Sequence, residues 1–369
     1  MLDTDVFVIG GGPAGIAAAM AARSRGLRVV VADGRRPPID KACGEGLMPD
    51  SVKAAAKIGI RLPDTQGFRF RGIQFFGDGH TVASDFPHGY GLGFRRTALH
   101  RELVEQAGQA NVEMLWSTPV TGIGDNAVHL NGRSISTRWI VGADGSGSLV
   151  RRWAGLNRFA RNSRRFAYRR HFARRPWTDF MEIYWGEACQ VYVTPVAANE
   201  VCVALISRSP DLRLEHALQL FPGLESHLTG VPASSSERGA ISATARLKAV
   251  VKGNVALLGD ASGSVDAITG EGLCQAFQQA AVLADAMAAG NLSRYALAHR
   301  RIAFRPALMA DMMLSMDRWP AIRRRAMAAL ARQPECFANM LAGHVGVLQP
   351  AQLVRSGLAL GWHMMYQSG

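Results

Sequence analysis

Short apolar runs alternate with glycine-rich turns at the start of the chain. Residues 5–9 form an apolar run that ends at the cluster GGGPAG, residues 10–15, and an alanine-rich stretch with helical spacing follows over 16–25. After Gly26, a β-branched run covers 27–32 and ends at Asp33. This pattern predicts a strand, a tight turn, a helix and a second strand. The two strands are expected to be parallel and joined by a right-handed crossover.

The hydrophobic pattern changes further along the chain. Residues 68–93 contain short strands broken by Gly, Asp and Pro, and residues 165–207 contain alternating segments that suit an antiparallel sheet. Helices are expected at 97–107 and from Gly272 to about Ala289, with buried strands at 139–141 and 255–258. From residue 292 the period is helical to the end of the chain.

Composition and charge exclude several classes of protein. The chain has 369 residues, is 48% hydrophobic and carries a formal charge of +13, from 42 basic and 29 acidic residues. A basic surface attracts nucleic acid, anionic lipid or anionic small molecules alike. The sequence has no nucleic-acid module with base-reading residues at fixed offsets, so we expect no nucleic-acid partner. The five cysteines are far apart, with no CxxC pair, which argues against a disulfide framework and a metal site.

The compartment is expected to be the cytoplasm. The first residues lack the basic start, apolar stretch and cleavage site of a secretory signal. The sequence has no uninterrupted run of about 18 apolar residues, so we expect no membrane-spanning helix. The C-terminal stretch from 304 to 340 mixes apolar residues with the basic cluster 323–325, which leaves open a peripheral contact with the inner face of a membrane. The oligomeric state, monomer or dimer, is left open.

The glycine cluster has the spacing of a dinucleotide-binding turn. Gly10 allows the tight turn, Gly12 lets the backbone approach a pyrophosphate, and Gly15 lets helix and strand pack closely. The helix N-terminus offers free amides and the positive end of its dipole to phosphate. Asp33 ends the second strand, 18 residues after Gly15, where its carboxylate can accept hydrogen bonds from a ribose.

Two further segments resemble a known family. GADGSGSLVR at 142–151, and GDASG at 259–263 continuing to GEGL at 270–273, resemble the second and third fingerprints of the FAD-dependent hydroxylases built like p-hydroxybenzoate hydroxylase. The resemblance implies FAD as cofactor and NAD(P)H as reductant. It also places Arg96, at a helix start, near the cofactor; the ordinary alternative is a solvated arginine.

A finer resemblance is to the geranylgeranyl reductase-like branch of this superfamily. It rests on KACGEG at 41–46 together with GEG at 270–272. In that branch the cysteine-glycine-glutamate loop lies beside the isoalloxazine, which makes Cys43 and Glu45 candidate catalytic residues, with Glu45 a proton donor. The alternative is a loop held by glycines with no chemical role. The segment QVYVTP at 190–195 departs from the prenyl reductase pattern, and the halogenase segment is also lacking.

The two resemblances together give an expected architecture and an expected cofactor site. We predict an α/β fold: a Rossmann-like, discontinuous FAD-binding domain with an inserted antiparallel-sheet substrate domain and C-terminal helices. The expected segments are 1–67, 94–160 and 248–292 for the FAD-binding domain, 68–93 and 161–247 for the substrate domain, and 293–369 for the helical segment. The positions expected to contact the cofactor are Gly10, Gly12, Pro13, Ala14, Gly15, Asp33, Gly34, Arg35, Cys43, Gly44, Arg96, Asp144, Gly145, Gly259, Asp260, Gly270, Glu271, Gly272 and Leu273.

The function expected from the sequence is an FAD-dependent monooxygenase of secondary metabolism. It would hydroxylate a small aromatic or polyketide-like substrate with NAD(P)H and O2. Tyr192, Trp185 and His171 are candidate substrate contacts, although aromatic residues at period two are often core. Two alternatives remain: an FAD-dependent reductase of a carbon–carbon double bond with a lipophilic, prenyl-like substrate, and a non-catalytic or maturation flavoprotein. The cofactor motifs do not choose between them.

Overall fold

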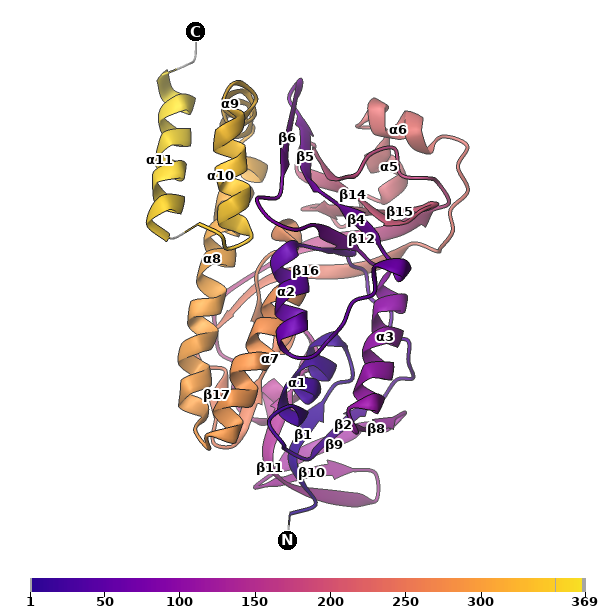
Figure 1. The fold of residues 1–369 in the computed structure, drawn as a ribbon, viewed down its shortest axis with the longest axis vertical. Helices are drawn as coiled ribbons and strands as arrows, with labels where there is room; N and C mark the ends of the chain where they lie inside the picture. Colours follow the sequence, from indigo (N-terminus) through magenta and orange to yellow (C-terminus); the bar gives the residue numbers. More distant parts are fainter. Residues whose placement is uncertain (1, 349, 367–369) are drawn as a thin grey trace.

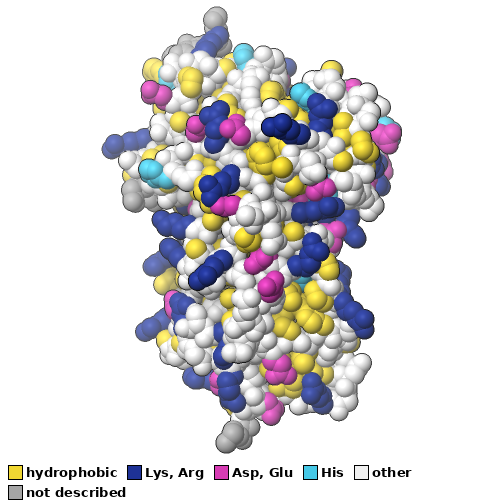
Figure 2. All heavy atoms as spheres, turned by 45° about the vertical axis from the view of Figure 1, so that its right-hand side comes forward, with side chains coloured by type: hydrophobic (Ala, Val, Ile, Leu, Met, Phe, Trp, Pro, Cys, Tyr) yellow, Lys and Arg dark blue, Asp and Glu magenta, His cyan; other side chains and the backbone are white. Residues whose placement is uncertain are grey.

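The computed structural model describes residues 2–348 and 350–366. Two large sheets lie one above the other along the long axis, and the C-terminal helices run along one side (Figure 1). Lysine and arginine side chains are spread over the length of the face in Figure 2. The predicted α/β fold is confirmed, whereas the boundaries of the domains stay a prediction.

The first sheet is the one predicted from the N-terminal pattern. Its strand order is β17-β18-β11-β1-β2-β8, with β10 paired to β11 and β9 paired to β10, and β1 is parallel to both of its neighbours. The strands are β1 (Thr4–Ile9), β2 (Val29–Asp33), β8 (Glu113–Trp116), β9 (Val120–Gly124), β10 (Ala127–Leu130), β11 (Arg133–Gly142), β17 (Val251–Lys252) and β18 (Val255–Leu257).

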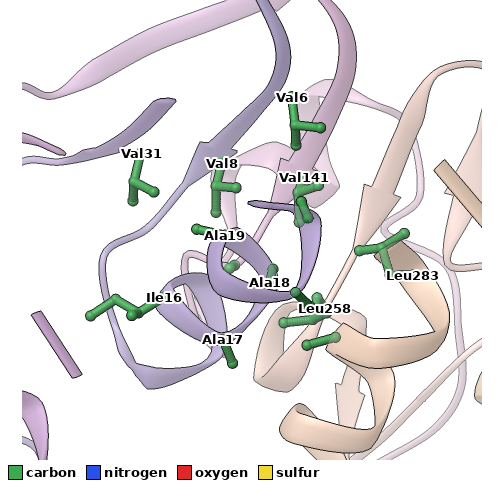
Figure 3. Packing of buried hydrophobic residues seen from close by; sticks show 14 of the residues in the cluster. Val6, Val8, Ile16, Ala17, Ala18, Ala19, Val31, Val141, Leu258 and Leu283 are labelled. Carbon is green, nitrogen blue, oxygen red and sulfur yellow. The ribbon is translucent and has the colours of Figure 1, made fainter. Parts of the chain in front are cut away.

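Small side chains let two helices pack tightly on this sheet. The helices beside it are α1 (Pro13–Arg23), α2 (Pro49–Lys57), α3 (Arg96–Gln109), α4 (Leu149–Trp153) and α7 (Gly272–Ala288). Figure 3 shows Ala18 and Ala19 of α1 near Val8 of the sheet and Leu283 of α7. Helix α1 begins at Pro13, earlier than expected, because a proline suits the first helical turn. It ends at Arg23.

The second sheet carries the material between the nucleotide fingerprints. Its order is β19-β16-β12-β15-β14-β13-β5-β6, and it is antiparallel except that β5 runs parallel to β13. The strands are β5 (Gly72–Gly77), β6 (His80–Asp85), β12 (Phe159–Phe172), β13 (Phe180–Trp185), β14 (Cys189–Ala197), β15 (Glu200–Ser207), β16 (Arg238–Leu247) and β19 (Gly263–Ser264). A small third sheet consists of β3 (Gly46–Leu47), β4 (Phe68–Phe70) and β7 (Gly91–Gly93).

The antiparallel sheet expected for 165–207 is confirmed, and both of its faces are covered. Strands β13 and β15 have few positions that reach solvent, because α5 (Leu214–Leu218) and α6 (Pro222–Leu228) cover one face. The C-terminal helices cover the other face. These helices are α8 (Leu292–Arg318), α9 (Pro320–Arg332), α10 (Pro334–His344) and α11 (Pro350–Tyr366). Among the described residues, no helix has the length and apolarity needed to cross a membrane.

Candidate functional site

The glycine cluster forms a closed turn between β1 and α1. A Cβ atom on Gly15 would lie 1.8 Å from the carbonyl oxygen of Gly10, so only glycine allows this approach. Gly10 itself has φ 112°. The Asp33 carboxylate holds the turn from the next strand, because it accepts hydrogen bonds from the amides of Gly11 and Arg35, both at 2.8 Å. Gly34 lies beside Pro119.

The N-terminus of α1 is open for an anion. Pro13 and Ala14 form its first turn, and no side chain among the described residues caps it. A Cβ atom on Gly12 would meet nothing within 4 Å, so space lies in front of the free amides. Ala14 also approaches the third fingerprint, since a Cβ on Gly259 would lie 2.7 Å from its methyl group. The turn therefore fits a pyrophosphate group.

The second fingerprint reaches the same turn and then starts a helix. A Cβ atom on Gly10 would lie 2.4 Å from the carbonyl oxygen of Ala143, so the two segments are in contact. Asp144 accepts hydrogen bonds from Ser148 Oγ at 2.5 Å and from the amide of Leu149 at 2.7 Å. Gly145 has φ 82° in the intervening turn. The hydrogen bonds of Asp144 thus go to the start of α4, and its contact with a cofactor stays a prediction.

The third fingerprint ends in a second open helix N-terminus. Helix α7 begins at Gly272, and its N-cap residue Glu271 forms no capping hydrogen bond within the described part of the chain. A Cβ atom on Gly272 would meet nothing within 4 Å. Leu273 packs on the core beside it. Asp260 is paired with Lys41 at 2.6 Å, which ties this fingerprint to the loop at 41–46.

Arg96 provides an independent test of whether a cofactor fits. Its backbone amide donates to Glu45 Oε1 at 3.0 Å, while its Nε is buried and finds no hydrogen-bond partner in the residues described. A buried donor without a partner costs about 1–3 kcal/mol unless a ligand accepts from it. Together with the two open helix ends, this donor fits FAD.

The loop at 43–46 lies over one face of the second sheet. The Gly44 carbonyl accepts a hydrogen bond from Thr194 Oγ1 at 2.7 Å, and the Cys43 carbonyl accepts from Cys202 Sγ at 3.7 Å. Glu45 is held at φ 60°, in the left-handed region that non-glycine residues rarely adopt. The sheet and this loop therefore fix where the Glu45 carboxylate points.

Glu45 points into a chamber that we call the polar chamber. It has a volume of about 250 Å³. Its lining consists of Asp40, Glu45, Arg95, Thr97, Arg169, His171, Ser235, Ser236 and Arg238. Asp40 pairs with Arg169 at 2.5 Å and with Arg238 at 2.6 Å. Most charges in this chamber are thus already neutralised within the protein.

A buried hydrogen-bond chain joins the polar chamber to the loop. The Arg169 guanidinium donates to His171 Nδ1 at 3.1 Å, so His171 carries its hydrogen on Nε2 and donates it to Glu45 Oε2 at 2.6 Å. Ser235 Oγ lies 2.8 Å from the same Nδ1. Arg169 Nε is buried, has no hydrogen-bond partner among described residues and lies 3.8 Å from Glu45 Oε1.

Cys202 completes a compact group with Glu45 and His171. A carboxylate oxygen of Glu45, a ring nitrogen of His171 and the sulfur of Cys202 lie within 4.8 Å of one another. Burial raises the pKa of the Cys202 thiol well above its ordinary value, so it stays protonated and donates its hydrogen. We therefore interpret the group as a hydrogen-bonded network.

A second chamber, which we call the apolar chamber, lies beneath the C-terminal helices. It also has a volume of about 250 Å³. Its wall is dominated by methionines from β13, α8, α10, α11 and the loop before α2. These are Met48, Met181, Met309, Met312, Met313, Met316, Met340 and Met364. Among the described residues that line it, none is Asp, Glu, Lys or Arg. Thr269 and Gly270 of the third fingerprint form one end of the wall.

One ionisable pair lies at the wall of the apolar chamber, and sequence reasoning missed half of it. His344 lines the chamber, and its Nδ1 lies 3.7 Å from Oε2 of Glu271. Both atoms are buried without a hydrogen-bond partner among described residues. Burial raises the pKa of Glu271 above its ordinary value, and nearby His344 opposes this shift. An isolated histidine in a C-terminal helix gave no signal in the sequence.

The three residues predicted to contact substrate lie in different places. Tyr192 lines the apolar chamber and donates a hydrogen bond to the Ile268 carbonyl at 2.9 Å. His171 lines the polar chamber. Trp185 is a core residue packed edge-on against Phe75, with ring centres 5.7 Å apart. The structure does not bring the three together, and their contact with substrate stays a prediction.

Comparison with known proteins adds to this geometry. Residues 3–291 match the protein family described as FAD binding domain. A menaquinone reductase of Mycolicibacterium smegmatis is 28% identical over 329 residues, which are 80% of this chain and 78% of that protein. A 3-(3-hydroxy-phenyl)propionate/3-hydroxycinnamic acid hydroxylase of Mycobacterium avium is 28% identical over 182 residues, 42% of this chain and 31% of that protein. The crystal structure of a flavoprotein/dehydrogenase from Cytophaga hutchinsonii superposes with a TM-score of 0.84 at 16% identity, covering 99% of this chain and 100% of that chain.

Proposed function

The chain belongs to the FAD binding domain family and is an FAD-dependent oxidoreductase, and on that premise we propose that it reduces a carbon–carbon double bond in a long apolar substrate of the isoprenoid lipid class. The observation that carries the proposal is the methionine-rich apolar chamber at Gly270, whose described lining has no Asp, Glu, Lys or Arg. This proposal places the reductase, which the sequence analysis gave as an alternative, before hydroxylation of a small aromatic molecule.

The chemistry of the apolar chamber suits a hydrocarbon chain. Burial of apolar surface contributes about 25 cal/mol per Å². Methionine side chains are flexible and polarizable, so they adapt to an irregular chain. A carboxylate or phenolate that moved from water into this chamber would find no charged partner there, and its burial would be costly. The menaquinone reductase matched over most of its length has a lipid quinone in its name, which supports the same substrate class.

Reduction of a double bond requires a hydride on one carbon and a proton on the other. FAD, when bound and reduced by NAD(P)H, would supply the hydride. The proton is assigned to His344, because histidine is the most common general acid in enzymes. The other ionisable group in the described wall, the Tyr192 phenol, already donates its hydrogen to the Ile268 carbonyl. Glu271 lies behind it and can exchange a proton with it. The two open helix ends and Arg96 hold the cofactor.

An anaerobic turnover assay tests this proposal. The purified protein with FAD is mixed with NADH or NADPH and menaquinone in detergent micelles under nitrogen. We expect a product whose isoprenoid chain has gained two hydrogen atoms, seen by mass spectrometry after the quinone ring has been reoxidised. A product that forms only with oxygen and gains an oxygen atom would overturn the proposal.

One observation favours hydroxylation as the second candidate function. The polar chamber contains a buried Arg169 whose Nε lacks a hydrogen-bond partner in the described chain, beside the ordered pair of Glu45 and His171. This arrangement suits a small anionic aromatic molecule. Oxygen uptake that rises when such a compound is added, with no reduction of menaquinone, would favour this function.

A further inference from the structure

Helix α11 is apolar on two sides. Gly357, Leu360, Gly361 and Met364 line the apolar chamber. On other positions, spaced four residues apart, Val354 is 56% exposed, Leu358 is 70% exposed and Trp362 is 57% exposed. Residues four apart lie on one face of a helix. A single helix therefore separates the chamber from an outward apolar stripe.

Exposed apolar side chains are concentrated in this part of the molecule. Thirteen large hydrophobic residues are exposed among those described, and eight of them lie within residues 292–366, about a fifth of the chain. On α8, Leu297, Phe304 and Leu308 are spaced along one face, and Phe304 is 65% exposed. Helices α8 and α11 lie on the same side of the molecule in Figure 1. Patches of this kind mark interaction surfaces.

The charge of the same helices indicates what covers them. Residues 292–366 contain ten arginines and no lysine, against three acidic residues, Asp311, Asp317 and Glu335. Arg324, Arg325 and Arg355 are exposed beside the apolar positions. Basic residues near an anionic lipid surface strengthen binding to it. A mixture of exposed apolar and basic side chains is typical of helices that lie in a membrane interface.

We propose that α8, α9 and α11 dock onto an anionic lipid bilayer, with the outward stripe of α11 in the boundary between headgroups and acyl chains. This inference rests on the proposed function in one respect: the docked α11 would place the apolar chamber next to the lipid that holds its substrate. The proposed contact with the membrane is peripheral, because the stripe lies on the surface of the protein.

A bilayer fits this surface better than a second copy of the chain does. In a two-fold symmetric dimer the same patch would face itself. The exposed arginines of the two copies would then lie close together with few acidic partners, because within residues 292–366 Asp317 is buried and Asp311 is paired with Arg161, which leaves Glu335. An anionic bilayer offers both the negative charge and the apolar depth.

Vesicle sedimentation measures docking without any turnover. The full chain with FAD is mixed with vesicles of phosphatidylglycerol and phosphatidylcholine, or with phosphatidylcholine alone. We expect binding to the anionic vesicles that weakens as salt is added. Leu358→Asp should weaken binding at least about tenfold, because an aspartate resists burial and is repelled by anionic lipid. Arg324→Glu should weaken it less and reduce its dependence on salt.

A matched control lies on a different surface. Leu220 is 54% exposed in the turn before α6, so Leu220→Asp introduces the same change away from α11. It should bind anionic vesicles like the wild type. Thermal unfolding and flavin absorbance confirm that each variant is folded. Because no substrate is used, a failure of the reductase proposal leaves this measurement intact.

Three results would overturn the docking proposal. The wild type could fail to sediment with anionic vesicles at low salt. Leu358→Asp and Leu220→Asp could bind equally well. Light scattering could reveal a dimer that Leu358→Asp dissociates, with no vesicle binding, which would assign the stripe to a second copy.

Discussion

The two chambers have equal volumes of about 250 Å³ and lie on the same face of the second sheet, but their side chains differ in chemistry. Arg169 and His171 of β12 line the polar chamber, whereas Met181 and Ile183 of β13 line the apolar chamber. The loop at 43–48 lies between them, since Glu45 faces one and Met48 the other. Charges in the polar chamber are satisfied by each other, while the apolar chamber has one ionisable pair at its wall. Ligand chemistry is therefore set by which end of the sheet face a substrate occupies.

The largest expected effect separates the two chambers by their histidines. His344→Gln should lower the rate of double-bond reduction by about 100- to 10,000-fold, the usual contribution of a general acid. His171→Gln is the matched control, a buried histidine in the polar chamber, and should change this rate little. Anaerobic single-turnover kinetics measures both, with flavin content confirming that cofactor is retained. The opposite pattern would place the substrate in the polar chamber.

The second prediction concerns the stability of the polar chamber. Asp40→Asn removes the anion that pairs with buried Arg169 and with Arg238. Leaving a buried charge without its partner should lower the free energy of unfolding by about 3–5 kcal/mol. Asp85→Asn breaks an exposed pair with Arg71 and should cost at most about 1 kcal/mol. Urea unfolding compares the two, and equal losses would show that the polar chamber holds no buried charge network.

The comparison also shows what the sequence could predict. The turn at 10–15 was predictable because its glycines are required by a local contact, such as that between Gly15 and the Gly10 carbonyl. The helices after residue 292 were predictable from their period. Neither chamber was, because each joins distant segments: Asp40 meets Arg169, and His344 meets Glu271. Such pairs leave no spacing in a single sequence.

The antiparallel sheet expected for 165–207 is confirmed, but the sequence did not indicate what covers its faces. Both faces of the second sheet are covered, by α5 and α6 on one side and by the C-terminal helices on the other. What covers a strand is decided by segments far along the chain. The cofactor was predictable from the sequence, and the two chambers were not.

The third prediction sharpens the size of the apolar chamber. Gly361 lines it, and a Cβ atom there would meet nothing within 4 Å, so Gly361→Leu should fill space without strain in the fold. We expect the KM for a long isoprenoid substrate to rise about tenfold, equal to roughly 1.4 kcal/mol, with little change for a short-chain analogue. Gly108→Leu on α3, also facing open space, is the control. An equal rise for both substrates would mean that the chain does not run along α11.

The smallest expected effect is a pH dependence at the edge of the apolar chamber. Burial holds the pKa of Glu271 above its ordinary value of about 4.5, so the folded state keeps a proton that the unfolded state has lost. Stability is therefore full below pH 4.5 and falls as pH rises toward the folded pKa, with a slope of at most about 1.4 kcal/mol per pH unit. Glu271→Gln should remove this slope, whereas Glu335→Gln, at an exposed position of α10, should keep it. The measurement is the free energy of unfolding at several pH values. If the slope is unchanged in Glu271→Gln, the carboxyl group next to His344 is charged and solvated in the folded protein. The wall of the apolar chamber would then carry a charge, as the polar chamber does.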